Sequence, residues 1–246
     1  MNKMDLSNKA IRLRKKLGED DSSPIDIFAL VQGIKNLTLI FYPLSKNISG
    51  VCYKGKDSHA ILINSDMSQG RQRFSLAHEL FHLFYDYKET MTASISEIGE
   101  GDELEREADQ FASYFLIPQY SLDEMIEKYV KKPISLEDVI MLEQYFGVSH
   151  QAMLYRLLDE KLISKRDKDS MQRGIIDKSA RLGYDTSLYY PSSDEKKIFS
   201  LGYYINKADE LLKEDIISEG KYEELILTAF RDDIVYGEAG YEYFLD

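Results

Sequence analysis

The pentapeptide HELFH supplies side chains that could bind a metal ion and activate a water molecule. It places His78 and His82 four residues apart, with Glu79 directly after the first histidine. On an α-helix, residues i and i+4 lie on nearly the same face, so both imidazoles could bind one ion. Glu79 lies about 100° around the helix from His78, which suits a general base rather than a ligand. A zinc site then needs a third protein ligand from elsewhere in the chain.

The residues around HELFH predict a buried helix that would hold these side chains rigidly. Apolar residues recur at helical spacing through residues 71–87, and Ser68 is a suitable N-cap before them. The whole chain contains 4 histidines, so two at this spacing around a glutamate rarely arise by chance. The motif and its helix therefore favour a metal site over a core helix with two packed histidines.

Upstream of this helix, the sequence pattern predicts an α+β unit of two helices and three strands. The helices cover residues 6–17 and 25–34, and the strands are LTLIFYP, GVCYKG and HAILINS (37–43, 50–55 and 59–65). The residues KGKDS between the last two strands are typical of a hairpin turn. We expect a small three-stranded antiparallel sheet packed beside the metal helix.

Three further expectations concern the strands and the chain after the metal helix. GVCYKG is the expected exposed edge of the sheet, where an extended substrate would add itself as a strand. Cys52 in that strand is expected to be a small buried hydrophobe, and His59 a packed or exposed residue without a functional role. Residues 88–102 lack periodicity and contain two glycines, so they are expected to form a loop beside the cleft.

A second helix, predicted over residues 103–118 (ELEREADQFASYFLIP), offers carboxylates for the third ligand position. Glu105 and Asp109 are again i and i+4 on one face. A carboxylate is a sound third ligand beside two histidines. A second carboxylate one turn further could accept the other N–H of a ligating imidazole and fix its tautomer. Glu107 and Glu103 are alternative ligands that the spacing leaves open.

HELFH, followed later in the chain by EREADQFASYFLIP, resembles the two helical motifs of the ImmA/IrrE family of zinc metallo-endopeptidases. The second motif has the form E-x-x-A-[DN]-x-F-A and ends in L-x-P, and the resemblance covers roughly residues 5–160. The resemblance implies a zincin-like minimal metalloprotease core with zinc, Zn(2+), held by His78, His82 and Glu105.

The same resemblance implies the remaining roles and the class of substrate. Glu79 would be the general base. Asp109 would not bind the metal itself but would contact one of the imidazoles that do. The substrates implied are helix-turn-helix repressors, often of the Xre type, whose cleavage would derepress mobile-element or stress genes.

The chain beyond the two motifs is expected to form two further segments. The sequence pattern of residues 134–163 predicts two helices joined by a turn that contains Gly147, which is the arrangement of a helix-turn-helix. The second helix carries few basic residues, so it would be a poor reader of DNA. We expect a metallopeptidase core over residues 1–130, a helix-turn-helix-like segment over 131–164, and an acidic, mostly helical region over 165–246.

Composition narrows the classes of function. The net charge is −12 with a pI near 4.9, which disfavours direct nucleic-acid binding. Residues 205–246 hold four basic residues against twelve acidic ones, a net charge of −8. The single cysteine indicates a reducing compartment, and the absence of an apolar leader or long apolar run favours a cytoplasmic protein without membrane segments.

Two hypotheses of function follow from the sequence. The first is a zinc-dependent endopeptidase that cleaves a specific protein partner, a helix-turn-helix repressor or a toxin. The second is an antitoxin or regulatory binding protein that docks a toxin or repressor through the acidic C-terminal region, with little or conditional proteolysis.

Overall fold

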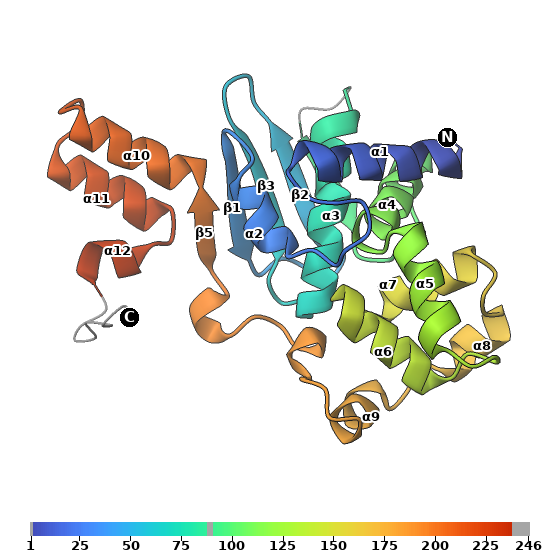
Figure 1. Cartoon of the computed structure of the whole chain (residues 1–246). Helices are drawn as coiled ribbons and strands as arrows, with labels where there is room; N and C mark the ends of the chain where they lie inside the picture. Colours follow the sequence, from blue (N-terminus) through green and yellow to red (C-terminus); the bar gives the residue numbers. More distant parts are fainter. Residues whose placement is uncertain (1, 88–90, 238–246) are drawn as a thin grey trace.

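A mixed sheet and the two motif helices form the centre of the fold (Figure 1). The computed structural model describes residues 2–87 and 91–237. The strands are β1 (Leu37–Tyr42), β2 (Ile48–Lys54), β3 (His59–Asn64), β4 (Met91–Ile95) and β5 (Phe199–Gly202). The first seven helices are α1 (Lys3–Lys16), α2 (Ile27–Gln32), α3 (Gln69–Tyr85), α4 (Glu103–Leu116), α5 (Gln119–Tyr129), α6 (Leu136–Phe146) and α7 (His150–Asp159). The mixed α+β class expected from the sequence is confirmed.

The sheet is larger than expected and is not purely antiparallel. Its strand order is β4-β2-β3-β1-β5, with β1 parallel to β3 and every other pair antiparallel. The prediction of a three-stranded antiparallel sheet is therefore wrong in strand number and in one pairing. The hairpin between β2 and β3 is present, with Lys54 paired to His59. The two additional strands come from segments without a strand pattern, so their pairing depends on the sheet that they join.

The edge of the sheet also differs from expectation. β2 lies between β3 and β4, so GVCYKG is an inner strand and its prediction as the exposed edge is wrong. The two edge strands are β4 and β5, and β4 lies within a segment predicted to be a loop. Residues 88–90 of that segment lie outside the described residues. An additional strand could therefore pair with β4 but not with β2.

The metal helix α3 packs against one face of the sheet, referred to below as the inner face. Ser68 caps it by accepting a hydrogen bond from the backbone N–H of Arg71, and residues 74–82 are all buried. Asp102 caps α4 in the same way, through the N–H of Glu105. At the other end of α4, the buried Arg14 donates a hydrogen bond of 2.7 Å to the carbonyl of Phe115. These contacts fix where both motif helices begin and where α4 ends.

The predicted helical pair is α6 and α7. Ser135 and Asp138 form a capping box, and Gly147 ends α6 with a φ of 64°, a left-handed conformation that favours glycine. Arg156 of α7 is fully buried, with its guanidinium stacked on the ring of Tyr114. This arginine is therefore not available to DNA.

The last part of the chain returns to the sheet. Residues 165–168 begin α8 (Lys165–Ser170), which is followed by α9 (Ile175–Arg181). After β5, three helices complete the described chain: α10 (Tyr203–Lys213), α11 (Glu219–Thr228) and α12 (Asp232–Tyr236). β5 pairs with β1, so the C-terminal region contributes a strand to the central sheet. Among the described helices, none is both long and apolar enough to cross a membrane.

Candidate metal centre

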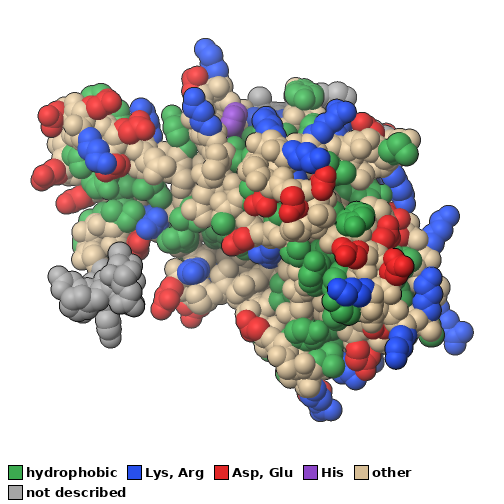
Figure 2. All heavy atoms as spheres, viewed as in Figure 1, with side chains coloured by type: hydrophobic (Ala, Val, Ile, Leu, Met, Phe, Trp, Pro, Cys, Tyr) green, Lys and Arg blue, Asp and Glu red, His purple; other side chains and the backbone are tan. Residues whose placement is uncertain are grey.

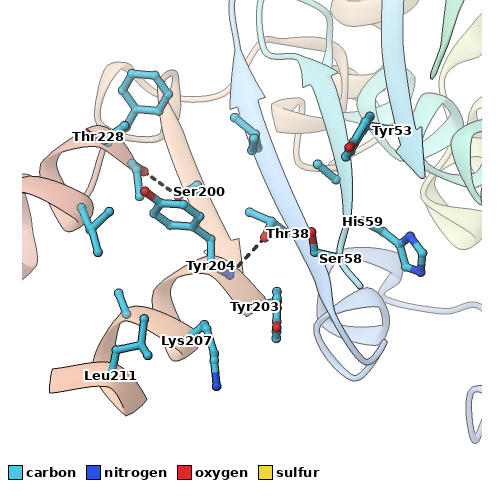
Figure 3. A pocket seen from close by; sticks show the side chains of 16 residues that line it. Thr38, Tyr53, Ser58, His59, Ser200, Tyr203, Tyr204, Lys207, Leu211 and Thr228 are labelled. Atoms are coloured by element: carbon cyan, nitrogen blue, oxygen red, sulfur yellow. Dashed lines mark hydrogen bonds between the residues drawn. The ribbon is translucent and has the colours of Figure 1, made fainter. Parts of the chain in front are cut away.

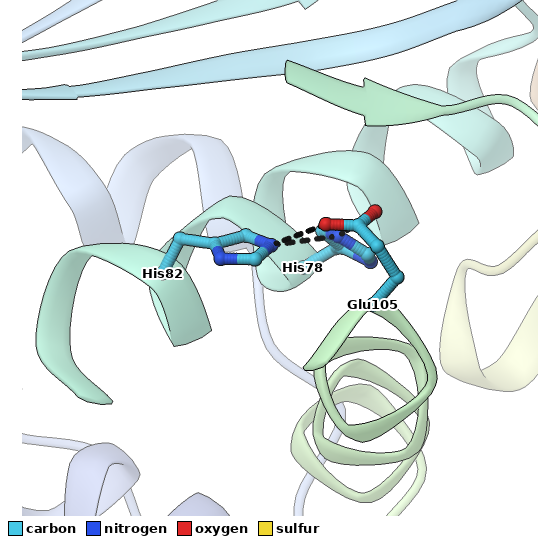
Figure 4. A group of neighbouring side chains, drawn as sticks. All are labelled: His78, His82 and Glu105. Atoms are coloured by element: carbon cyan, nitrogen blue, oxygen red, sulfur yellow. Dashed lines mark hydrogen bonds and ion pairs between the residues drawn. The ribbon is translucent and has the colours of Figure 1, made fainter. Parts of the chain in front are cut away.

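Two helices bring three potential ligands to one point. His78 and His82 of α3 and Glu105 of α4 point toward one another (Figure 4). The Nε2 atoms of the two histidines are 3.1 Å apart. The Glu105 carboxylate oxygens lie 3.4 Å from Nε2 of His78 and 3.2 Å from Nε2 of His82. Because His78 and His82 are four residues apart on α3, both imidazoles reach the same carboxylate on α4.

The three side chains fit a tetrahedral metal ion. Ligands at about 2.0–2.1 Å from a tetrahedral zinc ion are separated from one another by roughly 3.3 Å. The two Nε2 atoms are 3.1 Å apart, close to that value, and one ligand atom from each of the three residues lies within 4.8 Å of the others. The donor set and its spacing therefore suit a divalent cation.

The local charges favour a positively charged occupant. Burial acts to lower the pKa of His78, but hydrogen bonds with Asp109 and Glu105 outweigh it and raise that pKa to about 10. Burial acts to raise the pKa of Glu105, but its hydrogen bonds with His78 and His82 lower that pKa to about 2. The carboxylates thus stabilise positive charge at the imidazoles, whether it comes from protons or from a metal ion.

Each histidine contacts a carboxylate through its other ring nitrogen. Nδ1 of His78 lies 2.8 Å from Oδ1 of Asp109, and Oδ2 of Asp109 accepts a hydrogen bond from the backbone N–H of Gly99 at 2.6 Å. Nδ1 of His82 lies 3.5 Å from Oδ2 of Asp86, just after the end of α3. Asp109 is among the residues predicted from the sequence, whereas Asp86 is not. The i, i+4 spacing of Asp86 from His82 is the sequence signal that could have identified it.

Glu79 is buried beside the two histidines, on the side that faces the sheet. It is 0% exposed, and neither carboxylate oxygen has a hydrogen-bond partner among the described residues. Gly50 of β2 lies directly against it, and Gly50 pairs with Ser94 of β4. Burial raises the pKa of Glu79, while the nearby His78 and His82 oppose the rise. A carboxylate with a raised pKa next to a metal site is suited to proton transfer.

The alternative ligands from the sequence do not join the group. Of the carboxylates on α4 in the described structure, Glu105 forms a cluster with both histidines, whereas Glu103 and Glu107 do not. Instead, both line a cavity of about 820 Å³ that also reaches Glu105, Tyr85 and Thr92. The cavity gives a path from the surface to the ligand group.

Cys52 and His59 also lie apart from the ligand group. Cys52 is fully buried on the inner face of β2, where burial and the charge of Glu79 raise the pKa of its thiol to about 12. His59, at the start of β3, lines a different cavity beside the C-terminal helices. Neither belongs to the metal-ligand cluster in the part of the chain that the structure describes.

Comparison with known proteins places the two motif helices in a family. The IrrE N-terminal-like domain of the Peptidase_M78 family matches residues 36–158, which is half of the chain. The chain is 28% identical over 138 residues to the radiation response metalloprotease IrrE of Deinococcus deserti, covering 54% of this chain and 47% of that protein. It is also 28% identical over 139 residues to the protein of the same name from Deinococcus radiodurans, covering 55% and 40%. The chain thus matches less than half the length of either relative. With the domain match spanning α3 and α4, the chain belongs to the ImmA/IrrE family.

Proposed function

We propose that this chain is a zinc-dependent endopeptidase that cleaves a specific protein partner. The observation that carries the proposal is the convergence of His78, His82 and Glu105 at separations that suit tetrahedral zinc, with the unpartnered carboxylate of Glu79 beside them. Membership of a peptidase family supports the same reaction class.

In this proposal, each side chain has one task. His78, His82 and Glu105 hold zinc. Asp109 accepts a hydrogen bond from Nδ1–H of His78, which leaves Nε2 free for the metal, and Asp86 lies 3.5 Å from Nδ1 of His82, where it favours the same orientation. Bound zinc would supply a Lewis acid that acidifies a water molecule and polarises the scissile carbonyl. Glu79 accepts the proton of that water and passes it to the leaving amine.

The substrate in this proposal is a folded protein with an extended segment that pairs with the free edge of β4. β4 is the neighbour of β2 in the sheet, where its Ser94 pairs with Gly50, the residue that lies against Glu79. We propose a helix-turn-helix repressor, of the Xre type, as the protein cleaved, with derepression of mobile-element or stress genes as the consequence.

The test is cleavage of a repressor encoded next to this chain, with and without a chelator, by wild type and by Glu79→Gln. We expect fragments only from the wild type with metal. Full cleavage by Glu79→Gln would remove the assignment of Glu79 as general base. A stable complex with an intact repressor or toxin, without fragments although zinc is bound, would instead favour an antitoxin or regulatory binding protein.

A further inference from the structure

A cavity of about 660 Å³ beside the metal helix contains an arginine without an ion-pair partner among the described residues. The cavity is bounded by the start of α3, the segment after β4, the start of α7 and the helices α8 and α9. The arginine is Arg71 of α3. A different cavity, of about 430 Å³, lies between the sheet and the helices α10 and α11 (Figure 3). There the charged lining residue, Lys207, forms an ion pair with Glu210 at 2.7 Å. The unpaired charge of Arg71 distinguishes the first cavity.

The guanidinium of Arg71 is enclosed and only partly satisfied. Nη2 donates a hydrogen bond of 2.9 Å to the carbonyl of Ser96, and the guanidinium carbon lies 5.1 Å from the centre of the Phe74 ring. Nη1 is buried without a hydrogen-bond partner among the described residues. Burial lowers the pKa of Arg71 to about 10, while the charges of Asp109 and Glu79 oppose the decrease, so the side chain stays protonated at neutral pH. An anion that reaches Nη1 would satisfy both the charge and the donor.

Arg71 lies on the face of α3 that carries the metal ligands. It precedes His78 by seven residues, which is about 20° short of two full turns and roughly 10 Å along the helix axis. The loop after β4 connects the cavity with the metal centre. The backbone N–H of Gly99 in this loop donates to Oδ2 of Asp109 at 2.6 Å, and the adjacent Ile98 lines the cavity. The cavity of Arg71 is therefore next to the metal centre, on the N-terminal side of α3.

Strand β4 leads from the cavity at the metal ligands to the cavity of Arg71. Thr92, near its start, lines the cavity of about 820 Å³ that reaches the metal ligand on α4. Ser94 pairs with Gly50, which lies against the proposed general base. Ser96, just after β4, lines the cavity of Arg71. A substrate strand paired with β4 would therefore extend from the metal centre toward Arg71.

The other charged groups around the cavity leave its interior positive. Lys168 of α8 lines it and forms no ion pair among the described residues. His150, at the start of α7, pairs with a buried carboxylate of α6. Glu97 and Glu100 also line the cavity, but both are exposed, and neither pairs with the guanidinium. Because solvent screens exposed charges more strongly than buried ones, the charge of Arg71 dominates inside the cavity.

The exterior of the protein does not attract acidic segments in general. The net charge is −12, and Asp and Glu side chains are spread among Lys and Arg over the face shown in Figure 2. Selection of an acidic residue would therefore be a local property of this cavity. The apolar residues that line it suit the hydrocarbon part of such a side chain; they are Met67, Ile98, Ile175 and Ile176.

We propose that this cavity is a specificity subsite in which Arg71 binds an acidic side chain of the protein substrate. This inference rests on the proposed protease function and defines a class of substrate for the same site. Nη1 would donate a charge-assisted hydrogen bond to the substrate carboxylate, while Nη2 keeps its bond to Ser96. An extended chain advances about 3.3 Å per residue, so roughly 10 Å along α3 places the acidic residue about three residues from the scissile bond.

The test uses a randomised peptide pool as the probe. Synthetic peptides of about 12 residues, roughly 40 Å when extended, are incubated with the zinc-loaded full chain, and mass spectrometry identifies both fragments of each cleaved peptide. We expect Asp and Glu to exceed Asn and Gln by about tenfold or more at one position, about three residues from the cleaved bond. In a second arm, the pool is passed over immobilised, zinc-loaded Glu79→Gln, and the bound peptides should be enriched in Asp and Glu.

Three variants assign the preference to Arg71. Arg71→Gln removes the charge but keeps a donor for the Ser96 carbonyl, so the acidic preference should disappear in both arms. Arg71→Lys keeps the charge but loses the planar guanidinium, so the preference should fall without disappearing. Arg106→Gln is the matched control, because Arg106 donates to the carbonyl of Gly101 in the same loop but is exposed and does not line the cavity. It should keep the full preference. The zinc content of each variant shows whether the metal centre is intact.

The outcomes separate the subsite from the protease. Cleavage without an acidic preference, or with a preference that persists in Arg71→Gln, would overturn the subsite and leave the protease standing. Acidic enrichment of the bound pool that is lost in Arg71→Gln, without any cleavage, would keep the subsite and reject hydrolysis. Neither cleavage nor enrichment would reject both.

Two further results would also overturn the subsite. If Arg71→Gln loses its zinc, Arg71→Lys decides, and an undiminished preference in that variant contradicts the role of the guanidinium. Calorimetry with inorganic phosphate tests for a free anion in the same cavity. Saturable phosphate binding that is lost in Arg71→Gln, while neither peptide arm shows an acidic preference, would assign the cavity to a free anion.

Discussion

A methyl group at Gly50 would lie 2.6 Å from Oε1 of Glu79. Strand β2 therefore approaches α3 so closely that only a glycine leaves room for the buried carboxylate. The sheet limits where Glu79 can lie, because its side chain is enclosed between the two histidines and the backbone of β2. In the proposed mechanism, this contact positions the carboxylate of Glu79, the general base.

The first prediction follows from that contact. In Gly50→Ala, the added methyl should displace the carboxylate of Glu79, since Gly50 has no left-handed conformation that would itself forbid alanine. Cleavage should fall by about 10²- to 10⁴-fold, the usual contribution of a positioned general base. Metal content, measured by atomic emission, should stay at the wild-type level because the ligands do not move.

The control for this variant is Gly220→Ala in α11, where an added methyl meets no atom within 4 Å. It should keep full cleavage and leave stability equal or slightly higher. Gly50→Ala with wild-type activity would show that Glu79 tolerates a shift, which the proposed role does not allow.

The second prediction separates the carboxylates of α4. Glu105→Ala removes the oxygens that lie 3.2 and 3.4 Å from the two imidazoles, so it should lose bound zinc. Glu107→Ala should retain zinc, because Glu107 lines the neighbouring cavity outside the ligand cluster. The measurement is the metal-to-protein ratio after gel filtration. Loss of zinc in Glu107→Ala and retention in Glu105→Ala would show that the wrong carboxylate was assigned.

The third prediction concerns the carboxylates behind the histidines. Asp109→Asn should weaken zinc affinity by about 10- to 100-fold, because the acceptor at 2.8 Å from Nδ1 of His78 loses its charge. Asp86→Asn should have a smaller effect, since its oxygen lies 3.5 Å from Nδ1 of His82. Competition with a chromogenic zinc chelator measures both affinities. Identical affinities in wild type and Asp109→Asn would leave Asp109 without a role at the metal.

Much of the site was predictable from local spacing. The i, i+4 relation of His78 and His82 on one helix fixes their common face, whatever the rest of the fold does. The same relation on α4 pointed to Glu105 and Asp109, but spacing alone could not choose between Glu105 and Glu107. That choice depends on how α4 turns toward α3, which is set by packing between segments distant in the sequence.

The sheet was harder to predict, because its pairings are not local. β4 has the sequence MTASI and becomes a strand by pairing with β2, which lies about 40 residues earlier in the chain. β5 joins the sheet from a segment more than 150 residues after β1. The contact of Gly50 with Glu79 also depends on this register, so no pattern within β2 revealed it. Pairing between segments distant in the sequence thus determines the two additional strands and the contact of Gly50 with Glu79, which local patterns do not reveal.

The fourth prediction uses the buried thiol of Cys52. Burial, followed by the charge of Glu79, raises the pKa of Cys52 from 9.0 to about 12. Because the thiolate is the reactive form, the folded protein should resist iodoacetamide at pH 8, whereas urea-unfolded protein should react readily. Since the folded pKa is the higher one, the stabilisation from the neutral thiol is complete below pH 9 and is lost as pH rises toward 12.

The same pKa difference predicts a dependence of stability on pH that belongs to Cys52 alone. Above pH 9, the free energy of unfolding of wild type should fall relative to that of Cys52→Ala by about 1 kcal/mol per pH unit. Urea unfolding of both proteins at pH 8, 9 and 10 measures the difference and cancels the other titrating groups. If the free energies of unfolding of the two proteins change equally with pH, Cys52 is not enclosed between β2 and α3. Rapid alkylation of the folded wild type at pH 8 would mean the same.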